Sequence, residues 1–87
     1  MDKKAVKQAV EELINNQIAT KAPPETKETL DRLLADGMSK EEARKLIGQC
    51  ILIELFYVYK HKKPFGAERY VRNLKNLPKP PVNDPAA

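Results

Sequence analysis

The chain's one cysteine and one histidine, Cys50 and His61, are the residues from which a catalytic pair would have to be built. A thiolate activated by an imidazole is a nucleophile, and the two groups must then lie within hydrogen-bonding distance. The positions are eleven residues apart in one helical apolar segment, or about 16 Å at 1.5 Å per residue. Apolar neighbours also make Cys50 an inert core residue. We therefore expect no catalytic residue and no enzymatic activity.

Metal and cofactor sites need ligand sets that the sequence does not supply. One histidine and one cysteine cannot form a zinc site of several such ligands. No glycine-rich phosphate loop or nucleotide fingerprint is present. The carboxylates Glu11–Glu12 and Glu41–Glu42 are paired only in sequence, because adjacent residues on a helix point about 100° apart. We expect these four on solvated helix faces, and neither a metal ion nor a cofactor.

Glu54 is a carboxylate that the pattern places inside the fold. Its helical neighbours include Ile47, Ile51 and Val58, and an ionised carboxylate among them is costly unless it is paired. One interpretation is therefore a structural charge pair or hydrogen bond. The alternative is a functional pocket or a polar spot in a subunit interface. The candidate partners are Gln17, Tyr57, Arg69 and Tyr70.

The positive charge of the chain is concentrated in its last third. Residues 1–59 carry a net charge of −1 and residues 60–87 a net charge of +5, which together give the +4 of the whole chain. Such asymmetry indicates either a solvated surface or a basic contact face. A contact face would bind phosphates without reading bases, which makes weak nucleic-acid binding the alternative function. The predicted basic face comprises Lys62, Lys63, Arg69, Arg72 and Lys75, extended by Lys60 and Lys79.

Hydrophobic periodicity and capping signals predict an all-α fold. Asp2 is a plausible N-cap, Pro24 suits a first helical position, and Gly37 suits a helix end. Ser39 and Glu42 form a capping box at the start of the next helix. The expected helices cover about residues 2–19, 24–36, 40–60 and 67–77.

The predicted architecture is a small four-helix domain over residues 1–77, followed by a disordered proline-rich tail over 78–87. The third helix is apolar nearly all round between Cys50 and Tyr59, which predicts a central, mostly buried helix. Gly48 in its middle suggests the close approach of another helix, from this chain or from a second one.

The leading functional interpretation is a non-enzymatic interaction module that self-associates. The third helix carries more apolar surface than three short helices easily cover, and so small a core is marginal alone. We therefore expect a homodimer, with contact residues Leu52, Phe56 and Tyr59. No signal-peptide core is visible, and the longest apolar stretch, Leu46 to Tyr59, is shorter than the roughly 20 residues of a spanning helix. A cytoplasmic location without membrane contact is expected.

Several short motifs follow one another between about Ile14 and Pro78. They are Asn-Gln-Ile, Pro-Pro-Glu-Thr, Leu-x-x-Leu-x-x-x-Gly, Glu-Ala-Arg-Lys-Leu-Ile-Gly and Lys-Pro-Phe-Gly-Ala-Glu-Arg-Tyr-Val. Together they resemble a bacterial family of small all-helical domains of unknown function, a resemblance that implies a fold but no activity. Its members often carry histidine where Glu11 and Lys45 stand here, and this departure argues against a metal site. The family also tends to place aspartate where this chain has Gly66.

Overall fold

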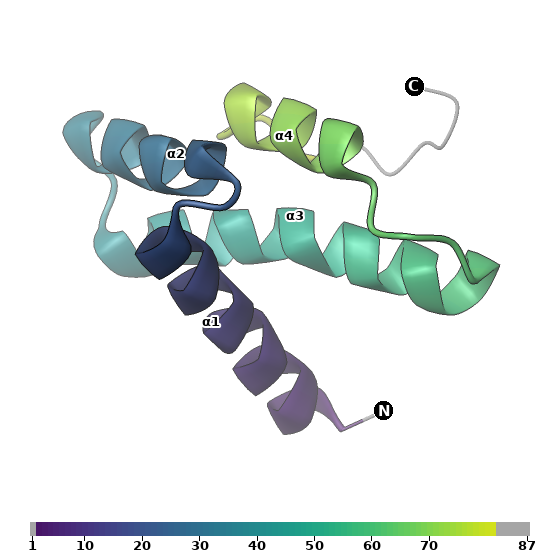
Figure 1. Cartoon of the computed structure of the whole chain (residues 1–87). Helices are drawn as coiled ribbons and strands as arrows, with labels where there is room; N and C mark the ends of the chain where they lie inside the picture. Colours follow the sequence, from purple (N-terminus) through teal and green to yellow (C-terminus); the bar gives the residue numbers. More distant parts are fainter. Residues whose placement is uncertain (1, 82–87) are drawn as a thin grey trace.

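The computed structural model describes residues 2–81, and these residues form four helices and no strand (Figure 1). The predicted all-α class is confirmed, with helix ends within about two residues of those expected. Asp2 caps the first helix, where its side chain accepts a hydrogen bond from the Lys4 amide. The predicted tail disorder falls largely on residues 82–87, which lie outside the described residues. The helices are α1 (Lys3–Thr20), α2 (Pro24–Ala35), α3 (Lys40–His61) and α4 (Ala67–Asn76).

The turn between α2 and α3 forms as its sequence predicts. Gly37 adopts a φ of 95°, which glycine accepts at little cost. The Met38 amide donates to the Leu33 carbonyl at 3.1 Å, completing a Schellman motif. Ser39 Oγ then accepts from the Glu42 amide at 3.1 Å. The Glu42 carboxylate accepts from the Ser39 hydroxyl at 3.2 Å, whereas the capping box predicted a bond to the backbone.

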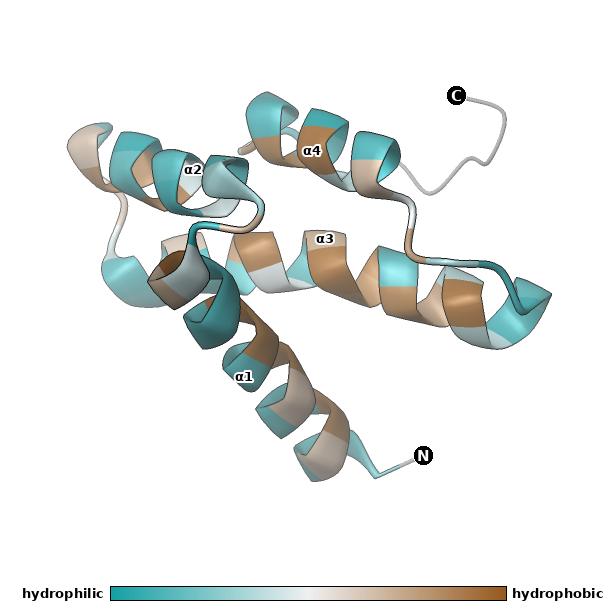
Figure 2. Cartoon of the chain, in the orientation of Figure 1, coloured by the Kyte–Doolittle hydropathy of each residue, from teal (hydrophilic) through white to brown (hydrophobic). Residues whose placement is uncertain are grey.

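The third helix is the centre of the fold, because α1, α2 and α4 all contact it. In Figure 1, α2 and α4 lie along one side of α3, and α1 crosses it at an angle. Hydrophobic residues are concentrated in the middle of α3, between its hydrophilic ends (Figure 2). The core is closed by side chains from all four helices, including Ile14, Leu33, Ile47, Ile51 and Leu74.

The crossing of α1 over α3 is set by Gly48. A Cβ atom added there would lie 3.1 Å from Val10 Cγ1, which is tighter than ordinary van der Waals contact. The predicted close approach of another helix is confirmed, and the approaching helix is α1. Because α1 crosses at this point, α3 continues beyond it toward His61 with one side uncovered (Figure 1).

Candidate functional site

Three large apolar side chains form an exposed stripe on α3. Leu52 is 41% exposed, Phe56 67% and Tyr59 63%. Steps of four and three residues place them on one side of the helix, away from the core residues Ile47 and Ile51. These are the residues predicted as homodimer contacts, and that role stays a prediction. Hereafter these three residues are called the α3 stripe.

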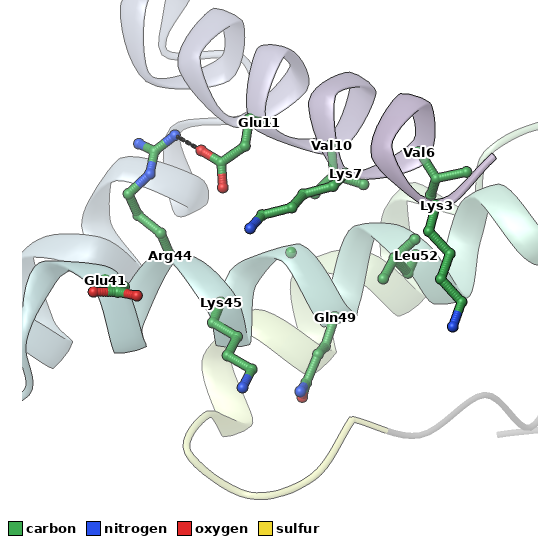
Figure 3. Close-up of a pocket in the computed structure, with 11 residues that line it drawn as sticks. Lys3, Val6, Lys7, Val10, Glu11, Glu41, Arg44, Lys45, Gln49 and Leu52 are labelled. Carbon is green, nitrogen blue, oxygen red and sulfur yellow. Dashed lines mark hydrogen bonds and ion pairs between the residues drawn. The ribbon is translucent and has the colours of Figure 1, made fainter.

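A groove between α1 and α3 adjoins the stripe at Leu52 (Figure 3). Its volume is about 670 Å³, and Val6, Val10, Gly48 and Leu52 give it an apolar floor. The groove lies beside the contact of Gly48 with Val10, where α1 diverges from α3 (Figure 1). Leu52 belongs to both groove and stripe, so the two form one continuous apolar surface.

Charged side chains border this groove. Arg44 on α3 donates to the Glu11 carboxylate on α1 at 2.6 Å and to the Asn15 amide oxygen at 2.9 Å. Glu11 is therefore part of an inter-helix ion pair (Figure 3), not simply a solvated carboxylate as the sequence suggested. The remaining charged side chains around the groove are Lys3, Lys7, Glu41 and Lys45.

Glu54 is completely buried and fully paired, as the sequence predicted. Arg69 Nε donates to Oε2 at 2.6 Å, and Arg69 Nη2 donates to Oε1 at 3.0 Å. The Gly66 amide donates to Oε1 at 2.9 Å, and the Arg69 guanidinium lies over the Tyr57 ring. Hydrogen bonding to Glu54 raises the pKa of Arg69. Both carboxylate oxygens are thus occupied, and the pair anchors the start of α4 on α3.

Gln17 and Tyr70, two other predicted partners of Glu54, form a separate network, so that part of the prediction was wrong. The hydroxyls of Tyr70 and Thr26 each donate to the Gln17 amide oxygen at 2.6 Å. The same hydroxyls lie 3.0 Å apart. Tyr70 is adjacent to Arg69 on α4 and so points in a different direction. This network joins α1, α2 and α4, and its Thr26 carried no signal beyond its place in a first helical turn.

Replacing Tyr70 by phenylalanine is expected to destabilise the protein by about 1–2 kcal/mol, because it removes a buried hydroxyl from this network. Burial raises the pKa of Tyr70 from 10.0 to about 12. The unfolded chain therefore ionises first, and this residue's contribution to stability declines between those pH values. Urea denaturation at neutral and alkaline pH tests both points. The Tyr70→Phe variant should lose less stability on going to alkaline pH than the parent chain; an equal loss would contradict this explanation.

The predicted basic face is smaller than the sequence suggested. The Arg69 side chain is only 10% exposed and is committed to Glu54, so its assignment to that face was wrong. Lys62, Lys63, Arg72 and Lys75 are exposed. Lys62 Nζ lies 5.0 Å from the Tyr59 ring centroid, next to the stripe. What remains are exposed cations at the end of α3 and on α4.

Cys50 and His61 are not brought together. Cys50 is buried at the centre of α3, and burial together with the nearby Glu54 raises its pKa to about 12. A thiol with this pKa stays protonated at neutral pH and is a poor nucleophile. His61 is exposed at the end of α3, where its ring contacts that of Tyr57 in a tilted arrangement, with 45° between the ring planes.

Comparison of the chain with protein-family models, with curated proteins and with solved structures found no match. The resemblance to a bacterial family therefore stays a prediction. Within the described part of the chain, no helix has the length and apolar character needed to cross a membrane. Residues 2–81 likewise contain no cluster of three or more His, Cys, Asp or Glu side chains arranged to hold a metal ion.

Proposed function

We propose that this protein is a non-enzymatic interaction module that self-associates through the α3 stripe. The observation that carries the proposal is the exposure of Leu52, Phe56 and Tyr59 side by side on one helix. Single exposed apolar residues are ordinary, but a contiguous group beside an apolar groove is typical of a docking surface. Aromatic side chains such as these are also enriched among the residues that dominate binding energy.

The size of the domain supports self-association. A chain of 87 residues buries a smaller share of its surface than a larger domain, which leaves its stability marginal. A second copy covering the stripe would remove the most exposed apolar side chains from water without disturbing the core. Both copies would then contribute the same residues to one two-fold interface.

The exposed surface of this protein suits a protein partner better than the phosphates of a nucleic acid. The stripe is apolar, and the basic face has lost Arg69 to the buried pair with Glu54. The remaining exposed cations are few, and the exposed aromatic rings near them, Phe56 and Tyr59, belong to the stripe. Nucleic-acid binding is therefore the less favoured of the two functions.

Replacing Phe56 by aspartate tests the proposal. The charge sits at the most exposed position of the stripe, so the dimer should weaken by about thirtyfold or more, which corresponds to at least 2 kcal/mol. Light scattering after size-exclusion chromatography, at two protein concentrations, measures the change. The matched control is Leu34→Asp, because Leu34 on α2 is 38% exposed and lies outside the stripe.

The parent chain and Leu34→Asp should dimerise equally, whereas Phe56→Asp should elute as a monomer with unchanged helical content by circular dichroism. If Phe56→Asp dimerises as tightly as the parent chain, the stripe is not the contact. If Leu34→Asp weakens the dimer as much as Phe56→Asp does, the contact surface has been misplaced.

A further inference from the structure

The side of α3 that carries the stripe has a symmetric spacing about Leu52. Toward the N-terminus the positions on this side follow in steps of four, three and four residues, and toward the C-terminus in steps of four and three. The next step of four leads to Lys63, just beyond the helix end. An alternation of this kind keeps the positions on one side of a nearly straight helix. Along α3 the positions are Glu41, Lys45, Gly48, Leu52, Phe56 and Tyr59.

Such symmetry matters because a two-fold axis pairs residues at equal distances from it. If two copies of α3 run antiparallel with Leu52 on the axis, each position meets one equally far away on the other side. The pairs that result within the helix are Leu52 with itself, Gly48 with Phe56, and Lys45 with Tyr59. Glu41 comes level with the two lysines that follow the helix end, Lys62 and Lys63.

Charge at the two ends of α3 favours the antiparallel direction. The first turn carries Glu41 and Glu42, and the last turn carries Lys60 and His61 and is followed by two lysines. An antiparallel pair sets each acidic end beside a basic end, whereas a parallel pair sets like charges together. The helix dipoles also oppose each other in the antiparallel arrangement.

Side-chain size favours placing Leu52 on the axis. Phe56 is the most exposed large apolar side chain among the described residues, and Gly48, which is buried against Val10, is one of the residues lining the groove of about 670 Å³. The pairing brings the large ring of one copy level with the groove of the other. With Phe56 on the axis instead, the two rings would meet head-on and Lys60 would face Leu52. The favoured pairing also sets Lys45 beside an aromatic ring, a contact that Lys62 already makes with Tyr59 at 5.0 Å.

We infer that the occupant of the α3 stripe is a second copy of this chain with its α3 antiparallel, Leu52 at the two-fold axis and Phe56 reaching the partner's α1–α3 groove. This inference rests on the proposed self-association and adds its direction and register. The Phe56 ring of each copy would then lie in the α1–α3 groove of the other copy.

Cysteine cross-linking tests the register of the two α3 helices. In separate variants, Leu52→Cys and Phe56→Cys are purified at equal concentration and oxidised mildly, and the covalent dimer is followed by non-reducing electrophoresis. Two cysteines form a disulfide when their Cα atoms lie about 4.4–6.8 Å apart, a condition that residues on a two-fold axis meet most readily. Leu52→Cys should cross-link about tenfold faster than Phe56→Cys. The parent chain is the control, since Cys50 is buried and unreactive.

Charge reversal tests whether the two α3 helices run antiparallel. Glu41→Lys and Lys63→Glu should each weaken the dimer by about tenfold, because symmetry repeats every altered pair. The double variant should return to within about threefold of the parent, a double-mutant coupling. Sedimentation velocity at low ionic strength measures the three dissociation constants.

The outcomes distinguish a failure of this inference from a failure of the proposed self-association. A dimeric parent whose Phe56→Cys variant cross-links faster than Leu52→Cys overturns the register and leaves self-association standing. A dimeric parent whose charge reversals do not compensate overturns the antiparallel direction. A parent chain that stays monomeric at high micromolar concentration overturns both.

Discussion

Replacing Arg69 by methionine should destabilise the protein by about 3–5 kcal/mol, because it leaves a buried charge without its counter-ion. The Glu54 carboxylate is fully buried and accepts two hydrogen bonds from Arg69 and one from the Gly66 amide. Without the guanidinium only the amide remains, and α4 loses its anchor on α3. Urea denaturation followed by circular dichroism measures the loss.

Two further variants make this expectation specific. Arg72→Met changes an exposed arginine on the same helix and should alter stability by no more than about 0.5 kcal/mol. The double variant Glu54→Leu/Arg69→Met removes both charges and should recover most of the loss, since well-packed apolar replacements of buried pairs are often neutral. If Arg69→Met costs no more than Arg72→Met, the buried pair does not hold α4 in place.

Replacing Gly48 by leucine should cost up to about 3 kcal/mol, because it forces a side chain into the crossing of α1 and α3. Even a single Cβ atom would lie 3.1 Å from Val10 Cγ1, so a larger group must push α1 away. Thermal unfolding at a concentration where each variant is monomeric measures the effect.

Gln49→Leu is the matched control for this variant, because Gln49 is the adjacent, exposed position of the same helix. It should change stability by no more than about 0.5 kcal/mol. Adding Val10→Ala to Gly48→Leu should restore part of the loss by making room at the contact. Equal stability of Gly48→Leu and Gln49→Leu would show that the crossing tolerates a side chain.

The elements of this fold could be predicted because their signals are local. Gly37, Ser39 and Glu42 mark the turn before α3 through backbone and capping preferences that need no tertiary context. The burial of Glu54 followed from its own helical neighbours, and the approach of a helix at Gly48 followed from a residue that weakens a helix unless packing requires it.

The partners of the buried groups could not be predicted in the same way. Arg69 and Tyr70 are adjacent, and which of them faces Glu54 depends on how α4 is placed by the short connection after α3. The sequence alone left Arg69 both in the basic face and among the candidate partners of Glu54. In the structure the start of α4 lies over Glu54, and this placement brings Arg69 into contact with the buried carboxylate.

One part of the candidate site could be predicted from local sequence, and the other depends on how the helices pack. The stripe is a property of the α3 sequence, so the pattern of that helix alone is enough to select Leu52, Phe56 and Tyr59 as candidate contact residues. The groove depends on where α1 crosses α3 and on the angle between them, which residues far apart in the sequence decide together. Its position beside the stripe is therefore a property of the packed helices (Figure 3).

Sedimentation equilibrium of the unmodified chain tests the central claim, self-association through the α3 stripe, most directly. At high micromolar concentration the measured mass should approach twice the 9.9 kDa of one chain, and it should fall toward that single-chain mass on dilution. A mass of one chain at every concentration would contradict the claim.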